Sequence, residues 1–575
     1  MASLIIFFAI SASFVAATRH SLPYVADVPI TRYPKANIST TTSHGGYYNF
    51  LNIRCGEAPI GPLRFSRPVP PRTVNRTIST GQEARTCYQA HPLWLNTAWQ
   101  RIQGVPLDEI KPSSFDINNP PSHDASQSED CLFLDVMATT KIFDKNSNTE
   151  PCDEGSGAPV LVWIDGGGFT GGYKHETNPA GLIKNSIILG EEFVYVSINY
   201  RLGLYGFLGG PTLRSNGDAN AGLLDQRLAL EWVQEYIHLF GGDQNRVTVM
   251  GESAGGGSIL HQITAFGGMR GPPPFQQAIL QSPGFQPNPG SIQQEKILYY
   301  VLNDASIFSN RSITTIDDLR SLDARTLAKV NDFIVANSYY GLYTFGPTVD
   351  GHFVPALPGQ ILADKKFHTS LALMIGRNDQ EGVLFTSPYI STKEEYIYNV
   401  KWFFPDAPSN TIDHIVSLYP DQLDGSYGYT NEMLRAAVTS AESCFTCNTR
   451  YLNAKVRNNS YVYSFNVPPA LHAEDVGYTF YNGPGSLTWD GKPVFGGAAL
   501  SLQDYIVNFV ATGTPNGRRV PEFPLYGDES NVLSINSSFL GTVSIDPVGI
   551  NGNTFQVYDG RKPDGCSVLI LYKTY

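Results

Sequence analysis

RVTVMGESAG, residues 246–255, combines a buried strand, a sharp turn and the start of a helix. The alternating and apolar residues of RVTVM predict the strand, and the sequence from Ala254 onward is compatible with a helix. Between them lies Gly251-Glu252-Ser253-Ala254-Gly255, a G-x-S-x-G motif. In this motif a strained turn exposes a serine hydroxyl above a sheet, and small residues let the backbone pass close to its neighbours. The context predicts that Ser253 is a nucleophile.

The same motif has two other interpretations. A glycine-rich turn without chemistry would show the same bare pattern, so the preceding strand is what favours the nucleophile. A phosphate-binding loop does not fit, because no Gly-Lys-Ser or Gly-Lys-Thr follows the glycines. For Glu252, beside the nucleophile, an electrostatic role in the pocket and a purely structural role both stay open.

Further strands and helices alternate around the motif. APVLVWI at 158–164 and FVYVSIN at 193–199 are continuous apolar runs, typical of strands buried on both faces, and another strand is predicted at 277–281. A helix is predicted over 224–240, where apolar residues recur on one face: Leu224, Leu228, Trp232 and Tyr236. This alternation predicts an α/β fold, with a mostly parallel sheet and helices on both faces. Functional side chains should then follow the carboxyl ends of the strands.

A second glycine-rich segment, Asp165-Gly166-Gly167-Gly168-Phe169, follows the strand at 158–164. Consecutive glycines let backbone N–H groups face a substrate oxygen, and each such donor contributes about 3 to 4 kcal/mol to transition-state stabilisation. We expect Gly167 and Gly168 to form an oxyanion hole together with Ala254. A flexible turn is the alternative, and the position upstream of the nucleophile motif favours the oxyanion hole.

At these residues the chain resembles the type-B carboxylesterase family, and it looks closest to secreted fungal carboxylesterases and lipases. Further matching motifs occur in the same order: APIGPLRFSRP at 58–68, SEDCL at 128–132, NYR at 199–201, NAGLLDQ at 220–226, FGGD at 240–243, PTVDG at 347–351 and GTPN at 513–516. The resemblance implies the α/β-hydrolase fold, a single domain over 18–575, and an enzyme that cleaves carboxylic esters.

The resemblance also implies the partners of Ser253. The family's acid precedes a glycine in a loop after a strand, which matches Glu381 before Gly382, and its histidine matches His472. The order of serine, acid and histidine is that of the α/β-hydrolases. From the residues alone, Asp379 competes as the acid. Among the histidines, His472 combines a preceding strand, the right chain order and the motif, whereas His261 is expected to pack in a helix and His352 to lie in a turn.

One disulfide can be carried over from the family, between Cys87 and Cys131. The loop that it closes contains Trp94 and Trp99. In related lipases this region forms a lid, and an ordinary surface loop with aromatic anchors is an equal alternative. Trp94 and Trp99 alone do not establish a cation-binding site.

Two departures from the family pattern bear on the site. Asp165 stands where the family often has histidine, and we infer that its carboxyl points away from the oxyanion, which it would otherwise destabilise. Ser282-Pro283 replaces the usual Ser-Gly, a change that affects the shape of the acyl pocket.

The N-terminal sequence indicates export. MASLIIFFAISASFVAA, residues 1–17, resembles the apolar segment and cleavage site of a signal peptide, and its apolar run is too short to span ~30 Å of hydrocarbon as a membrane anchor. Five glycosylation sequons agree with a secreted, extracellular protein: they begin at Asn37, Asn75, Asn310, Asn458 and Asn536. The net charge of −12 argues against nucleic acid and anionic membranes as partners.

In an oxidising compartment most of the cysteines should form disulfides, and they do not suggest a metal site. The odd total of 7 leaves at least one unpaired, and the pairing of five of them is not predicted: Cys55, Cys152, Cys444, Cys447 and Cys566. The spacing of Cys444 and Cys447 suits zinc, but no second pair of ligands completes such a site. No metal or organic cofactor is expected.

We therefore predict a serine hydrolase that cleaves small-molecule or lipid esters through Ser253, His472 and Glu381, by way of an acyl-enzyme. Acyl transfer to an alcohol or amine would use the same residues. A non-catalytic binding or adhesion role is disfavoured because the serine and histidine positions are filled. The sequence does not identify the ester or its chain length, and a monomer is the default expectation.

Overall fold

The computed structural model describes residues 37–41, 45–72, 85–147, 157–288, 291–537 and 542–545. The predicted signal peptide at 1–17, the sequon at Asn75, and the cysteines Cys152 and Cys566 lie outside these residues. In the described part of the chain, no helix is both long and apolar enough to cross a membrane.

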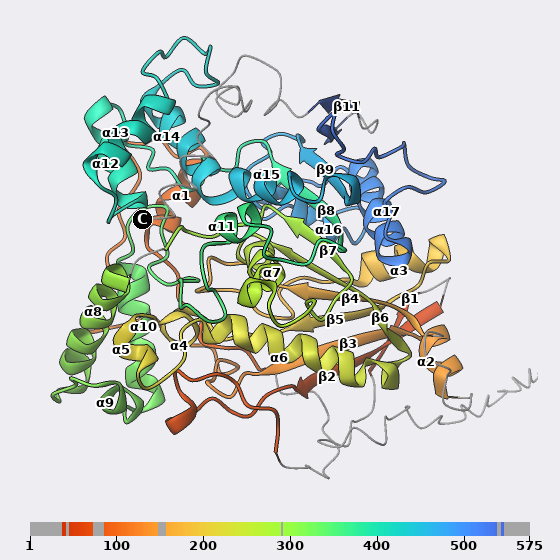
Figure 1. Cartoon of the computed structure of the whole chain (residues 1–575), viewed down its shortest axis with the longest axis horizontal. Coiled ribbons are helices and arrows are strands. Elements are labelled where there is room, and N and C mark those ends of the chain that lie inside the picture. The colour runs from red at the N-terminus through yellow and green to blue at the C-terminus, as the bar shows by residue number, and fades with distance from the viewer. Residues whose placement is uncertain are drawn as a thin grey trace, which may run out of the picture.

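An eleven-stranded sheet runs through the molecule (Figure 1). In spatial order its strands are β1 (Asn37–Thr41), β2 (Gly45–Arg54), β3 (Phe133–Thr139), β5 (Val194–Ile198), β4 (Ala158–Ile164), β6 (Gly242–Glu252), β7 (Gln277–Gln281), β8 (Ala372–Asn378), β9 (Ser460–Phe465), β10 (Asn531–Ile535) and β11 (Thr542–Ile545). Every neighbouring pair from β5 to β10 is parallel, and the pairs at both edges are antiparallel. The predicted mostly parallel sheet is confirmed.

Helices cover both faces of the sheet. The helices are α1 (Trp94–Ile102), α2 (Thr140–Ser147), α3 (Ala180–Leu189), α4 (Gly203–Phe207), α5 (Pro211–Arg214), α6 (Ala221–Tyr236), α7 (Ala254–Ile263), α8 (Ser291–Ser309), α9 (Ile316–Arg320), α10 (Ala324–Ala336), α11 (Pro358–Ala363), α12 (Lys393–Phe403), α13 (Ser409–Leu418), α14 (Glu432–Ala441), α15 (Cys447–Asn453), α16 (Glu474–Thr479) and α17 (Gly496–Thr512). One apolar core joins α6 and α7 to the sheet, and a second, on the opposite face, joins α3, α16 and α17 to it. Figure 1 shows α8–α10 and α12–α14 as further groups beside the sheet.

The strands at 158–164 and 277–281 have the predicted bounds, because continuous apolar runs mark strands that are buried on both faces. β6 extends beyond the predicted 246–250 to Gly242–Glu252, since Gly242 pairs with Ala158 of β4 and Glu252 pairs with Gln281 of β7. The predicted helix at 224–240 begins earlier, at Ala221, and its last turn at Ile237–Phe240 is a 3₁₀ helix.

The predicted apolar face of α6 was wrong in part. Of the four residues that recur every fourth position, only Trp232 is fully buried, whereas Leu224, Leu228 and Tyr236 are half-buried. The face toward the core contains Leu223, Ala229, Leu230 and Val233 beside Trp232, together with paired polar groups. Asp225 forms a buried ion pair with Arg201 (2.7 Å), and the Gln226 amide donates to Ser258 Oγ (2.9 Å). The spacing of apolar residues cannot predict polar side chains that pair with each other inside a core.

The disulfide between Cys87 and Cys131 is present in the structure. Cys55 is a buried free thiol, and burial raises the pKa of this thiol to about 12, which keeps it protonated and unreactive. Among the predicted glycosylation sites, Asn310 and Asn458 are exposed and Asn536 is half-buried. Asn37 lies in β1. Glycosylation itself stays a prediction.

Replacing Asp225 with alanine should lower the free energy of unfolding by about 3–5 kcal/mol, because the Arg201 guanidinium would be left buried without its counter-ion. The matched control is Asp421→Ala, which breaks an exposed pair with Lys393 and should cost no more than about 1 kcal/mol. Urea titration of both variants provides the measurement. Equal losses in the two would contradict the structural role of the buried pair.

Candidate active site

Ser253 occupies the turn between β6 and α7 in a strained backbone conformation, with φ 55° and ψ −121°. Its N–H donates to Gln281 O (3.0 Å), and its carbonyl accepts from the N–H groups of Gly257 and Gly284 (both 2.8 Å). A Cβ atom at Gly255 would lie 2.0 Å from Ile164 O, so only glycine fits there. Close packing on all sides therefore maintains a conformation that a serine rarely adopts.

Three side chains from distant segments meet in one hydrogen-bonded line. Ser253 Oγ lies 2.8 Å from His472 Nε2, and His472 Nδ1 lies 2.5 Å from Glu381 Oε2. Glu381 follows β8 and His472 follows β9, so both come from the carboxyl ends of parallel strands, as the serine does. His472 and Glu381 are buried.

The competing residues do not join this line. Asp379 is exposed and accepts a hydrogen bond from the Gln380 amide (2.6 Å). His261 is buried in α7 with its ring against Phe285, as predicted. His352 is exposed, and its N–H donates to Asp350 in a turn.

A second layer of polar groups holds the Glu381 carboxylate. Glu381 Oε1 accepts hydrogen bonds from Ser282 Oγ (2.6 Å) and from the N–H of Asn378 (2.7 Å). The Asn378 amide in turn donates to Ser282 Oγ and to Asp475 Oδ1, both at 3.1 Å. Tyr463 OH donates to the other oxygen of Asp475 (2.7 Å). These contacts orient the carboxylate toward the imidazole.

The sequence did not predict that Ser282, Asn378 and Asp475 hold the catalytic carboxylate in place. Their position along the chain could have indicated a role for two of them. Ser282 directly follows β7 and Asn378 ends β8, at the sheet edge where functional groups lie. Asp475 lies three residues after His472, at the start of α16. The contact between these residues depends on strand order, which no local pattern reveals.

The His472 ring packs against Phe385 and Phe445, with ring centroids 4.9 Å and 4.4 Å away. Glu252 Oε1 lies 3.2 Å from His472 Nε2, on the same side as the serine. Burial lowers the pKa of His472, but the carboxyl groups of Glu252 and Glu381 raise it by more, and the resulting pKa is above its usual value. Burial raises the pKa of Glu252 to about 8. These two adjacent groups therefore titrate as a pair.

The glycine segment after β4 lies beside the serine. Gly168 and Ala254 line a pocket together with Ser253, and Ala254 is the first residue of α7, whose N–H has no acceptor in a preceding helical turn. Gly168 has φ 63°, and a Cβ there would lie 2.3 Å from the Tyr343 ring. Gly167 stabilises the loop, because its carbonyl accepts from the N–H of Gly171 (2.9 Å).

The carboxyl of Asp165 points away from the serine, as inferred from the sequence. Its Oδ1 accepts a hydrogen bond from the Trp163 indole (2.7 Å), on the face of the sheet opposite α7. Burial raises the pKa of Asp165 well above its usual range. The departure from the family pattern at this position therefore places no carboxylate toward the oxyanion.

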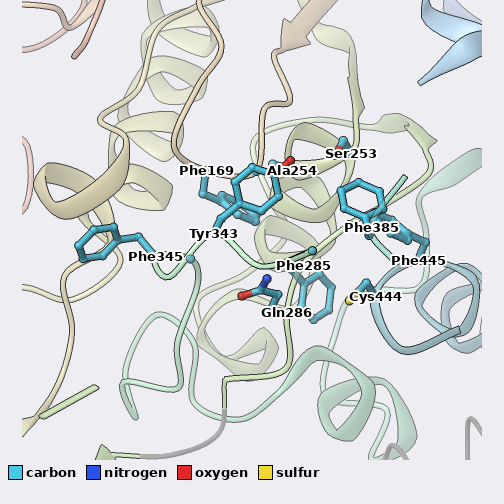
Figure 2. A pocket seen from close by; sticks show the side chains of 14 residues that line it. Phe169, Ser253, Ala254, Phe285, Gln286, Tyr343, Phe345, Phe385, Cys444 and Phe445 are labelled. Carbon is cyan, nitrogen blue, oxygen red and sulfur yellow. The ribbon is translucent and has the colours of Figure 1, made fainter. Parts of the chain in front are cut away.

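The pocket beside Ser253 has an empty volume of about 430 Å³, part of which is open to solvent, and is mainly aromatic (Figure 2). Its aromatic lining residues are Phe169, Phe285, Tyr343, Phe345, Phe385 and Phe445. In the described part of the chain, no cluster of three or more His, Cys, Asp or Glu side chains could hold a metal ion.

The loop closed by the Cys87–Cys131 disulfide packs on the wall of this pocket. Trp94 of α1 donates its indole N–H to Leu342 O (2.8 Å), and its ring contacts Tyr343 and Phe385. Trp99 packs edge-to-face on Trp489. The expected aromatic anchors are present, and movement as a lid stays a prediction.

The sheet order, the strained serine turn and the three aligned side chains define an α/β-hydrolase. A solved structure with the same fold is that of Aspergillus niger EstA, with a TM-score of 0.75 and 24% identity, covering 96% of this chain and 99% of that one.

The chain belongs to the carboxylesterase family, whose model matches residues 36–544. The carboxylesterase patB of Aspergillus clavatus is 39% identical over 517 residues, which cover 87% of this chain and 91% of that protein. Lipase 1 of Geotrichum candidum is 28% identical, covering 90% of this chain and 93% of that protein. Other relatives are named secreted lipases. The protein is a carboxylic ester hydrolase, as the sequence predicted.

Replacing Glu252 with glutamine should shift the acid limb of the kcat/KM profile to lower pH. His472 must be neutral to accept a proton, so activity is lost as pH falls through its raised pKa. Glutamine keeps the shape of the side chain but removes a carboxyl group that raises this pKa. The exposed Glu394→Gln on α12 is the control and should leave the profile unchanged. An acid limb that stays in place in Glu252→Gln would exclude this electrostatic role.

Proposed function

We propose that Ser253, His472 and Glu381 hydrolyse carboxylic esters through an acyl-enzyme. The observation that supports this most strongly is the continuous line from Ser253 Oγ through His472 to Glu381. His472 Nε2 accepts the serine proton as the oxygen attacks the ester carbonyl. Glu381 keeps the imidazole in the required orientation and stabilises its cation.

The N–H groups of Gly168 and Ala254, with that of Gly167, stabilise the oxygen of the tetrahedral intermediate. Gly168 and Ala254 line the same pocket as Ser253, which supports this assignment. His472 then gives its proton to the departing alcohol, which leaves the acyl group on Ser253. A water molecule, activated by the same imidazole, releases the acid and regenerates the enzyme.

The protein acts outside the cell in this proposal. The apolar sequence at 1–17 supports export, as do the exposed sequon asparagines Asn310 and Asn458 and the relatives named as secreted lipases. Its single catalytic domain extends over 18–575.

Ser253→Ala and His472→Ala should each lower kcat for p-nitrophenyl ester hydrolysis by a factor of about 10⁴ to 10⁶, and Glu381→Gln by about 10⁴, because the three groups act as one unit. The exposed Ser417→Ala serves as the control and should retain full activity. Circular dichroism checks that each variant is folded. A folded Ser253→Ala protein with near-normal turnover would contradict the proposal.

A further inference from the structure

One lining residue differs in chemistry from the rest of the aromatic pocket. Gln286 is the only amide side chain among the described lining residues, and six aromatic rings surround the same space. Its Nε2 atom is buried and has no hydrogen-bond partner in the described structure. A buried donor without a partner is unfavourable, and native structures contain few of them. Figure 2 shows the amide nitrogen directed toward the middle of the labelled lining residues.

The backbone around Gln286 is held firmly to the catalytic turn. Gly284 N–H donates to Ser253 O (2.8 Å), and Phe285 N–H donates to Cys444 O (3.2 Å). On the other side of Gln286, the carbonyl of Asn288 accepts from the N–H of Val349. The amide is therefore carried by a segment that is fixed relative to the nucleophile, as a specificity-determining group must be.

The position of His472 indicates which part of an ester reaches Gln286. His472 must protonate the departing alcohol, so the alcohol lies toward the imidazole. Phe385 and Phe445 pack on that imidazole, and Figure 2 shows both rings at the right, Phe345 at the far left and Gln286 between them. The acyl group, which extends away from the leaving alcohol, is then directed toward Gln286.

We propose that Gln286 makes the enzyme selective for esters whose acid part carries a hydrogen-bond acceptor oxygen, such as a ketone or ether, in preference to plain alkyl acids. The inference rests on the proposed function of Ser253. A ketone or ether oxygen satisfies the buried N–H of Gln286, whereas a methylene at the same place leaves it without a partner. The aromatic side chains bind the carbon atoms on either side of that oxygen.

The test compares pairs of p-nitrophenyl esters of equal acyl length. In each pair one acid is a straight alkyl chain, and the other carries a ketone in place of one methylene, at the fourth, fifth or sixth carbon. The measured quantity is the ratio of kcat/KM for the keto ester to that for the alkyl ester, in the wild type and in Gln286→Leu. Intrinsic reactivity is the same for both enzymes and cancels. For at least one ketone position, the ratio should fall about tenfold in Gln286→Leu.

Gln422→Leu, at an exposed glutamine, is the matched control and should keep the wild-type ratio. Labelling with a fluorophosphonate counts the active sites, so rates refer to folded enzyme, and Gln286→Asn provides a second variant should the leucine variant fail to fold. If the ratio in Gln286→Leu stays within twofold of the wild-type ratio at every ketone position, the inference about Gln286 is wrong, while the proposed function of Ser253 is unaffected. Absence of any ester turnover by the wild type would overturn the proposed function as well.

Discussion

The turn at Ser253 is the constraint on which the rest of the site depends. A serine with φ 55° is unfavourable by itself, and it persists because Gln281 of β7, Gly257 of α7 and Gly284 all form hydrogen bonds with its backbone. The close approach of Gly255 to Ile164 O leaves no room for a side chain. The same turn presents the hydroxyl toward His472 and begins α7 at Ala254. The nucleophile and one oxyanion donor thus share a single backbone feature.

The parallel sheet supplies the remaining geometry. β7, β8 and β9 end side by side, so Ser282, Asn378 and the loop that carries His472 meet without any contact that is local in sequence. Burial of Glu381 is tolerated because Ser282 and Asn378 donate to the oxygen that does not face the imidazole. The pocket beside the serine is mainly aromatic. The Gln286 amide that lines it, and the Glu252 carboxyl next to His472, therefore have a large influence on substrate choice and on charge.

Much of this arrangement could be predicted from the sequence, because its signals are local. Continuous apolar runs gave the central strands, and G-x-S-x-G after a strand identified Ser253; the family motif added Glu381 and His472, which the structure brings together. The core face of α6 was less accessible, since it combines apolar residues such as Leu223 and Leu230 with the buried polar side chains of Asp225 and Gln226. Ser282, Asn378 and Asp475 could not be assigned, because their partners lie about 100 residues away. The unpartnered amide of Gln286 depends on pocket shape, which no sequence pattern records.

The central claim, that Ser253 carries the acyl group during turnover, can be measured directly. The protein is mixed with a p-nitrophenyl ester, quenched in acid within the first turnover, and analysed by intact mass and peptide mapping. The account predicts a gain of one acyl group per molecule, located on Ser253 in the peptide that contains GESAG. Ester hydrolysis with the acyl group on another residue, or with no acyl group on the protein at any time after mixing, would contradict it.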